Sequence, residues 1–153
     1  MPRPHQPRLL QLLHGLTALL VPLAWLSGLV VLSQNDGRWG RLPFTLPGDW
    51  VDVHGSFGAL LWPVALLFGV YALGPGRWRL SRWGNALPLL ALVLAVGSGK
   101  AMQEDWLRQG QLDQLVYQLH LLAWLLLAVA VLVHLLTLLR RGGWPLLRSM
   151  LPR

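Results

Sequence analysis

Between Gln118 and Leu139 the chain reads QLHLLAWLLLAVAVLVHLLTLL, an uncharged run long enough to cross a bilayer, since a spanning helix needs about 20 apolar residues. Two histidines in this run, His120 and His134, lie 14 residues apart. In a helix with about 100° and 1.5 Å per residue, this spacing puts both imidazoles on nearly one face, about 21 Å apart. Ionisable side chains inside a span are costly and are read as functional. The run therefore predicts a helix that supplies one ligand near each side of a membrane.

Three more apolar runs precede this one. The expected spans cover residues of about 9–32, 50–73, 85–102 and 113–139. Of the 153 residues 12% are charged, against about 25% in a typical soluble domain. We therefore expect an all-α membrane protein, a four-helix transmembrane bundle forming a single domain over 1–153, with a basic interfacial tail at 140–153. A signal peptide is the rival reading of the first run, but the run exceeds the usual core of about 7–15 residues and no small-residue cleavage pattern follows.

Charged residues are divided unequally between the two sides of these spans. The N-terminus, the second loop and the tail hold nine basic residues and no acidic one: Arg3, Arg8, Arg77, Arg79, Arg82, Arg140, Arg141, Arg148 and Arg153. The first and third loops hold four basic residues (Arg38, Arg41, Lys100 and Arg108) against six acidic ones (Asp36, Asp49, Asp52, Glu104, Asp105 and Asp113). By the positive-inside rule, both termini are expected in the cytoplasm. Nucleic-acid binding is not expected despite the net charge of +7, because the basic residues lie in short segments between apolar runs.

Orientation converts histidine positions into depths. His14 lies about six residues into the first span from the cytoplasmic side, and His134 lies six residues before the basic end of the fourth. His54 lies near the outer end of the second span, and His120 lies about seven residues in from the outer end of the fourth. The histidines therefore form two depth-matched pairs, His14 with His134 and His54 with His120. His5 precedes the first span and has no partner at its depth.

Two histidines on facing helices are the ligands that a six-coordinate haem b requires, one on each face of the ring. The chain has no cysteine, which excludes iron–sulfur clusters, thiolate zinc sites and the covalent attachment of c-type haem. Hydrogen-bonded contacts between helices or a proton relay are an alternative role for the histidines. A copper or zinc site is another, but its ligands would cluster at one depth. The two matched depths favour two non-covalent, bis-histidine haems b.

Small and cationic residues could complete such sites. Gly28 lies 14 residues after His14 and Gly69 lies 15 after His54, so both could make room for a haem, although glycine is also common at helix contacts. Candidate partners for the propionates are Arg38, Arg41, Lys100 and Arg108 outside, and Arg8, Arg140 and Arg141 inside. Taken one by one, each cation is better explained as an interfacial charge that extends to water.

These residues resemble the bacterial cytochrome b561 family, four-span dihaem proteins within the wider cytochrome b/b6-like group. The resemblance lies in LLHGLTALLVPLAWLSG around His14, VDVHGSFGALLWPV around His54, the spacing of His120 and His134, and the ending GGWPLLRSMLPR. It covers nearly the whole chain, although Gly15 stands where family members often have Trp. By this resemblance, the first and last histidines would ligate the cytoplasmic-side haem and the other two the periplasmic-side haem.

The resemblance implies a function in electron transport. It implies a dihaem cytochrome of the bacterial cytoplasmic membrane, surrounded by lipid, that carries electrons between an outer-side donor and a quinone. In the family, donors include superoxide or a redox partner subunit. One alternative is a haem-b membrane-anchor subunit of a larger respiratory dehydrogenase or hydrogenase, and another is a non-redox small transporter or sensor. A homodimer and a subunit of a larger complex both stay open, as does the choice between a quinone-linked oxidoreductase and a non-catalytic electron carrier.

Overall fold

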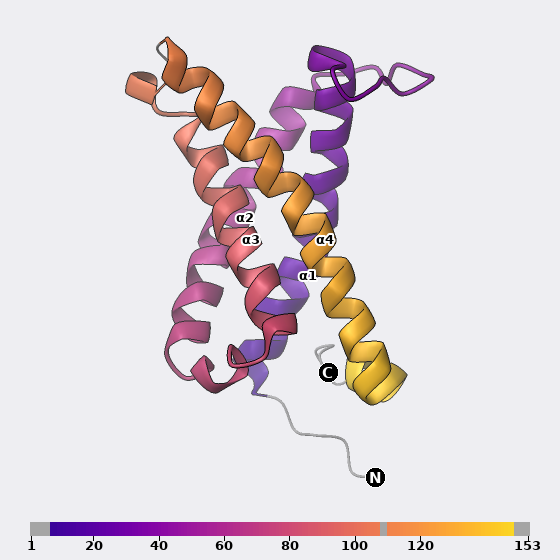
Figure 1. The fold of residues 1–153 in the computed structure, drawn as a ribbon, viewed down its shortest axis with the longest axis vertical. Helices are drawn as coiled ribbons and strands as arrows, with labels where there is room; N and C mark the ends of the chain where they lie inside the picture. Colours follow the sequence, from indigo (N-terminus) through magenta and orange to yellow (C-terminus); the bar gives the residue numbers. More distant parts are fainter. Residues whose placement is uncertain (1–6, 108–109, 149–153) are drawn as a thin grey trace.

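The protein is built from helices that run along one axis (Figure 1). The computed structural model describes residues 7–107 and 110–148, and none of the residues in these two ranges lies in a strand. Four of its helices are long and apolar enough to cross a membrane. This confirms the expected all-α, four-helix class. The start of α1 and the end of α4 lie at one end of the bundle, and the connections after α1 and α3 lie at the other.

The four long helices correspond to the four expected spans. They are α1 (Arg8–Val31), α2 (Trp50–Leu73), α3 (Trp83–Ala101) and α4 (Gln111–Arg148), with short helical turns η1 (Leu32–Asp36), η2 (Arg77–Arg79) and η3 (Asp105–Leu107) between them. The start of α2 is capped by Asp49, whose carboxylate accepts hydrogen bonds from the backbone N–H groups of Val51 and Asp52, each at 3.1 Å.

The first and fourth helices extend beyond the bounds expected from the sequence. The first span continues through η1 into the expected loop, and it ends at Gly37, which takes the left-handed conformation with φ of 68°. The fourth helix begins at Gln111 and extends beyond 139 to Arg148, with a break at Gly143, where φ is 54°. Helical backbone satisfies its own hydrogen bonds, so these helices continue until a glycine can adopt the left-handed conformation.

Helix packing leaves the two histidine levels on either side of a small core. Helix α1 packs against α2, α3 packs against α4, and α2 and α3 join these two hairpins. The buried core cluster consists of Val21, Leu61, Ala65, Ala91, Leu92, Leu127 and Ala130. Leu127 lies seven residues from both His120 and His134, so this core lies midway between the two levels. Its alanines let the helix backbones approach closely.

The outer surface of the bundle is apolar. Large side chains such as Leu67 (58% exposed), Val70 (64%) and Leu132 (57%) point away from the core. Apolar surface of this extent along spanning helices is matched by lipid chains, which are as apolar as leucine. The protein is therefore a multi-pass membrane protein whose helices contact lipid.

Candidate functional site

Two pairs of imidazoles lie at different levels of the bundle. His14 on α1 faces His134 on α4, with ring centroids 6.3 Å apart. His54 on α2 faces His120 on α4, with centroids 6.0 Å apart. Each pair joins one histidine of the α1–α2 hairpin to one of the α3–α4 hairpin. The structure therefore brings together the same pairs that share a depth in the sequence.

The separation within each pair suits a shared iron. Two imidazoles that bind one metal from opposite sides, through bonds of about 2 Å, hold their ring centres about 6 Å apart. Across residues 7–107 and 110–148, no group of three or more His, Cys, Asp or Glu side chains is placed to hold a metal ion. Each pair thus offers two donors, and an iron held there takes its other ligands from a cofactor. A haem, which supplies four equatorial nitrogens, fits this donor set.

Hydrogen bonds orient three of the four rings. The Nδ1 atom of His54 lies 3.0 Å from the Ala24 carbonyl oxygen, and that of His134 lies 2.6 Å from the Gly84 carbonyl oxygen. The Nδ1 atom of His120 lies 3.0 Å from the Ser98 hydroxyl oxygen. A carbonyl oxygen can only accept, so Nδ1 of His54 and of His134 carries the proton and Nε2 keeps its lone pair. Metal-binding histidines usually use their second nitrogen in this way.

The two glycines expected to make room for haem lie in different surroundings. A Cβ atom added to Gly28 would lie 3.0 Å from Cε1 of His54 and 3.4 Å from Nε1 of Trp124. Gly28 therefore allows two side chains to pack closely against α1. A Cβ atom added to Gly69 would meet no heavy atom within 4 Å, so the space beside it is open.

A pair of tryptophans connects the two hairpins near the level of His54 and His120. Trp25 on α1 and Trp124 on α4 stack with centroids 4.4 Å apart and planes 5° from parallel. Each indole N–H donates to the backbone oxygen of the other residue, at 3.2 Å and 3.1 Å. We call this reciprocal arrangement the tryptophan clasp. It joins α1 to α4 through side chains, whereas the backbones of these two helices do not pack closely.

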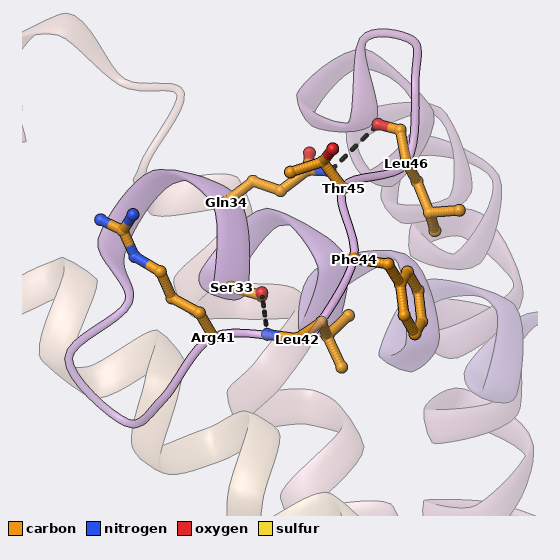
Figure 2. A pocket seen from close by; sticks show the side chains of 7 residues that line it. All are labelled: Ser33, Gln34, Arg41, Leu42, Phe44, Thr45 and Leu46. Carbon is orange, nitrogen blue, oxygen red and sulfur yellow. Dashed lines mark hydrogen bonds between the residues drawn. The ribbon is translucent and has the colours of Figure 1, made fainter.

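Two arginines between α1 and α2, Arg38 and Arg41, lie beside shallow hollows. A hollow of about 320 Å³ lies in the loop after α1, and Arg41 is one of its lining residues (Figure 2). There the Ser33 hydroxyl accepts from the Leu42 N–H at 2.8 Å. The second hollow, of about 430 Å³, lies where the end of α1 meets the start of α4. There Arg38 bonds Asp36 at 2.6 Å, which raises the pKa of the Arg38 guanidinium, and Tyr117 donates to the same carboxylate at 2.5 Å.

The positions of the other candidate cations do not indicate a role in binding propionates. Arg8 lies exposed at the first residue of α1, and Lys100, near the end of α3, bonds Gln103 at 3.0 Å. Arg140 and Arg141 lie exposed on the last part of α4. Arg108 lies outside the described residues. None of these positions identifies a side chain that would bind a haem propionate, so the assignment of propionate partners stays a prediction.

Sequence reasoning missed the residues that hold the rings. Gly84, Ser98 and Gly99 belong to α3, which carries no histidine, and Ser27 belongs to α1. Gly99 lies against His120 as Gly28 lies against His54, with a Cβ-to-Cε1 distance of 3.0 Å in both cases. A signal was present for Ser27, Ser98 and Gly99 but not for Gly84, because the spacing Ala-x-x-Ser-Gly occurs both at 24–28 and at 95–99.

Comparison with known proteins gave one result. The family model for prokaryotic cytochrome b561 matches residues 5–153, nearly the entire chain. Searches of curated proteins and of solved structures found no significant match.

Proposed function

The chain belongs to the prokaryotic cytochrome b561 family, and on this premise we propose that it carries electrons across the membrane through two haems b, each held between two histidines. The family implies a membrane protein that binds haem b and transfers electrons. We further propose that there are two haems, that histidines are their ligands, and that the redox partners are an outer-side donor and a quinone.

The observation that carries the proposal is the spacing of the imidazole pairs, 6.3 Å and 6.0 Å between ring centroids. His14 and His134 would bind one iron from opposite sides, and His54 and His120 would bind the other. When bound, haem b supplies an iron centre that accepts and releases one electron. Two imidazoles leave no open position on the iron, so these residues favour electron transfer over oxygen activation.

The route would cross the bilayer along α4. His120 and His134 are 14 residues apart, so the two sites are separated by about 21 Å along this helix. We infer from the distribution of arginine that both termini face the cytoplasm and that His54 and His120 lie on the outer side of the bacterial cytoplasmic membrane. Electrons would pass between an outer-side donor, such as superoxide or a redox protein, and a quinone at the membrane boundary.

Haem content and absorption spectra of purified variants test the ligand assignment. His14→Ala and His120→Ala should each lose one haem, because each removes a ligand from a different pair. His5→Ala is the matched control, since His5 precedes α1 and belongs to neither pair. Full haem content with unchanged low-spin bands in both pair variants would refute the assignment.

A role as the haem-b anchor of a larger dehydrogenase or hydrogenase is the second candidate. It is favoured by the short outer connections, residues 37–49 and 102–110, which leave little room for a substrate site of the protein's own. Co-purification distinguishes the two functions. A stable partner subunit supports the anchor, whereas an isolated protein that reduces quinone supports the independent carrier.

A further inference from the structure

The two outer-side histidines are held by the same local arrangement on two different helices. On α1, the Ser27 hydroxyl lies 3.2 Å from Nδ1 of His54. On α3, the Ser98 hydroxyl lies 3.0 Å from Nδ1 of His120. Both serines are buried, at 3% and 5% exposure, and each is followed by the glycine that lets its imidazole approach the helix.

The direction of these hydrogen bonds follows from the number of hydroxyl protons. The Ser27 hydroxyl donates to the Ala24 carbonyl at 3.0 Å, and the Ser98 hydroxyl donates to the Leu94 carbonyl at 2.6 Å. A serine hydroxyl has one proton, so toward the imidazole its oxygen must accept. Nδ1 therefore donates in both histidines, and both Nε2 atoms keep the lone pair that binds iron.

The inner pair lacks this arrangement among the described residues. There, Nδ1 of His134 bonds the Gly84 carbonyl at 2.6 Å, and His14 makes an edge contact with the Phe68 ring, with centroids 6.4 Å apart. Nδ1 of His54 also bonds a backbone carbonyl, that of Ala24 at 3.0 Å, so the two sites differ in the added serine hydroxyl beside each Nδ1 atom of the outer pair. Such acceptors fix the tautomer of a metal-bound histidine and increase its basicity, which stabilises the oxidised metal.

We propose that Ser27 and Ser98 are matched positioning residues that hold His54 and His120 in the ligating tautomer and lower the reduction potential of the outer-side haem. The inference rests on the proposed function, because it requires that these two histidines bind one haem. Each serine acts through its histidine and contacts no reacting group itself. In the sequence, both serines lie in the same Ala-x-x-Ser-Gly spacing, at 24–28 and at 95–99.

Potentiometric titration of the purified holoprotein tests the proposal, with the outer-side wave identified by its loss in His120→Ala. Ser98→Ala should raise the potential of that wave, and Ser27→Ala should raise it by less, because the Ala24 carbonyl still accepts from Nδ1 of His54 at 3.0 Å. Both variants should leave the inner-side wave unchanged. A tenfold loss of preference for the oxidised iron equals an upward shift of about 59 mV for one electron. Ser98→Thr keeps the hydroxyl and should restore the potential. Ser56→Ala, which removes an exposed hydroxyl two residues after His54, should change neither wave.

A purely structural role gives a different result. If the alanine variants lose haem but the outer-side haem that remains keeps its potential and its low-spin electron paramagnetic resonance g-values, the serines only support packing and the proposal is overturned. Unchanged haem content with unchanged potentials overturns it as well. Neither outcome affects the proposed function, which fails instead if the wild-type protein lacks two low-spin haems.

Discussion

Two glycines on α3 provide a matched test of how closely a helix must approach a candidate iron ligand. Gly97 and Gly99 are two residues apart on the same helix, but their surroundings differ. A Cβ atom added to Gly97 would meet no heavy atom within 4 Å, whereas one added to Gly99 would lie 3.0 Å from Cε1 of His120. Gly97→Ala and Gly99→Ala add the same methyl group and differ in what that group contacts.

The size of the effect follows from this distance. Carbon atoms pack at about 3.5–4.0 Å, so Gly99→Ala requires the His120 ring to move by about 0.5–1 Å from its present 3.0 Å. Ligand distances in metal sites hold to about 0.2 Å. The required movement is therefore several times larger than ligation tolerates. Both substitutions also replace a glycine within a helix by alanine, and this replacement by itself stabilises the helix by about 0.8–1 kcal/mol.

We expect Gly97→Ala to retain both haems and to match or exceed the thermal stability of the wild type. Gly99→Ala should lose the haem proposed to lie between His54 and His120, or keep it with altered low-spin g-values. Haem-to-protein ratio by the pyridine haemochrome method and electron paramagnetic resonance measure the two expectations. The reasoning is wrong if Gly99→Ala has two haems with wild-type g-values, because α3 then yields to the methyl group without disturbing His120.

Three further predictions concern other parts of the bundle. Trp25→Phe and Trp124→Phe should each destabilise the protein by about 0.6 kcal/mol, a typical value for a hydrogen bond between spanning helices, and a double-mutant cycle in reversible unfolding should show coupling between them; additive effects would mean that the tryptophan clasp is not a unit. Gly69→Ala should lower the content of the inner-side haem if the open space beside Gly69 accommodates it, and unchanged haem content would assign that glycine to helix packing. The chain has no cysteine, so Ser81→Cys should react with a membrane-impermeant thiol reagent from the cytoplasmic side and Thr45→Cys from the outer side; the reverse pattern would invert the proposed topology.

Hydropathy and charge were sufficient to predict the number of helices and most of their bounds. The α2 helix coincides with the expected second span, 50–73, because Asp49 is a capping residue that precedes a long apolar run. The end of the first span was less predictable. The expected span ends at 32, because Asn35, Asp36 and Gly37 are residue types that favour turns. In the structure the Asn35 amide bonds the Val31 carbonyl, and the helical turn continues to Asp36. A side chain that bonds its own helix removes the turn that its residue type favours in isolation.

In the candidate site, the pairing of the histidines was predictable from the sequence, whereas the residues that hold their rings were not. The depths of His14, His54, His120 and His134 predict which imidazoles face each other, since depth depends on position along a helix and on orientation. What holds each ring depends on how α1 and α3 rotate about their own axes, and apolar periodicity is weak in helices that face lipid on most sides. For this reason the serines and Gly84 could not be selected by depth. The tryptophan clasp escaped prediction because its bonds run to backbone oxygens of a distant helix.

The division of the bundle into two hairpins has a consequence for how the protein is made. Helices α1 and α2 form one close pair and α3 and α4 another, while each imidazole pair takes one ring from each hairpin. With the proposed ligation, each haem is a cross-link between two units that can form as the chain enters the membrane. A newly inserted protein without haem would lack the iron bonds, but its hairpins would still be joined by the packing of α2 on α3 and by the tryptophan clasp. Haem would then bind between two halves that are already in contact.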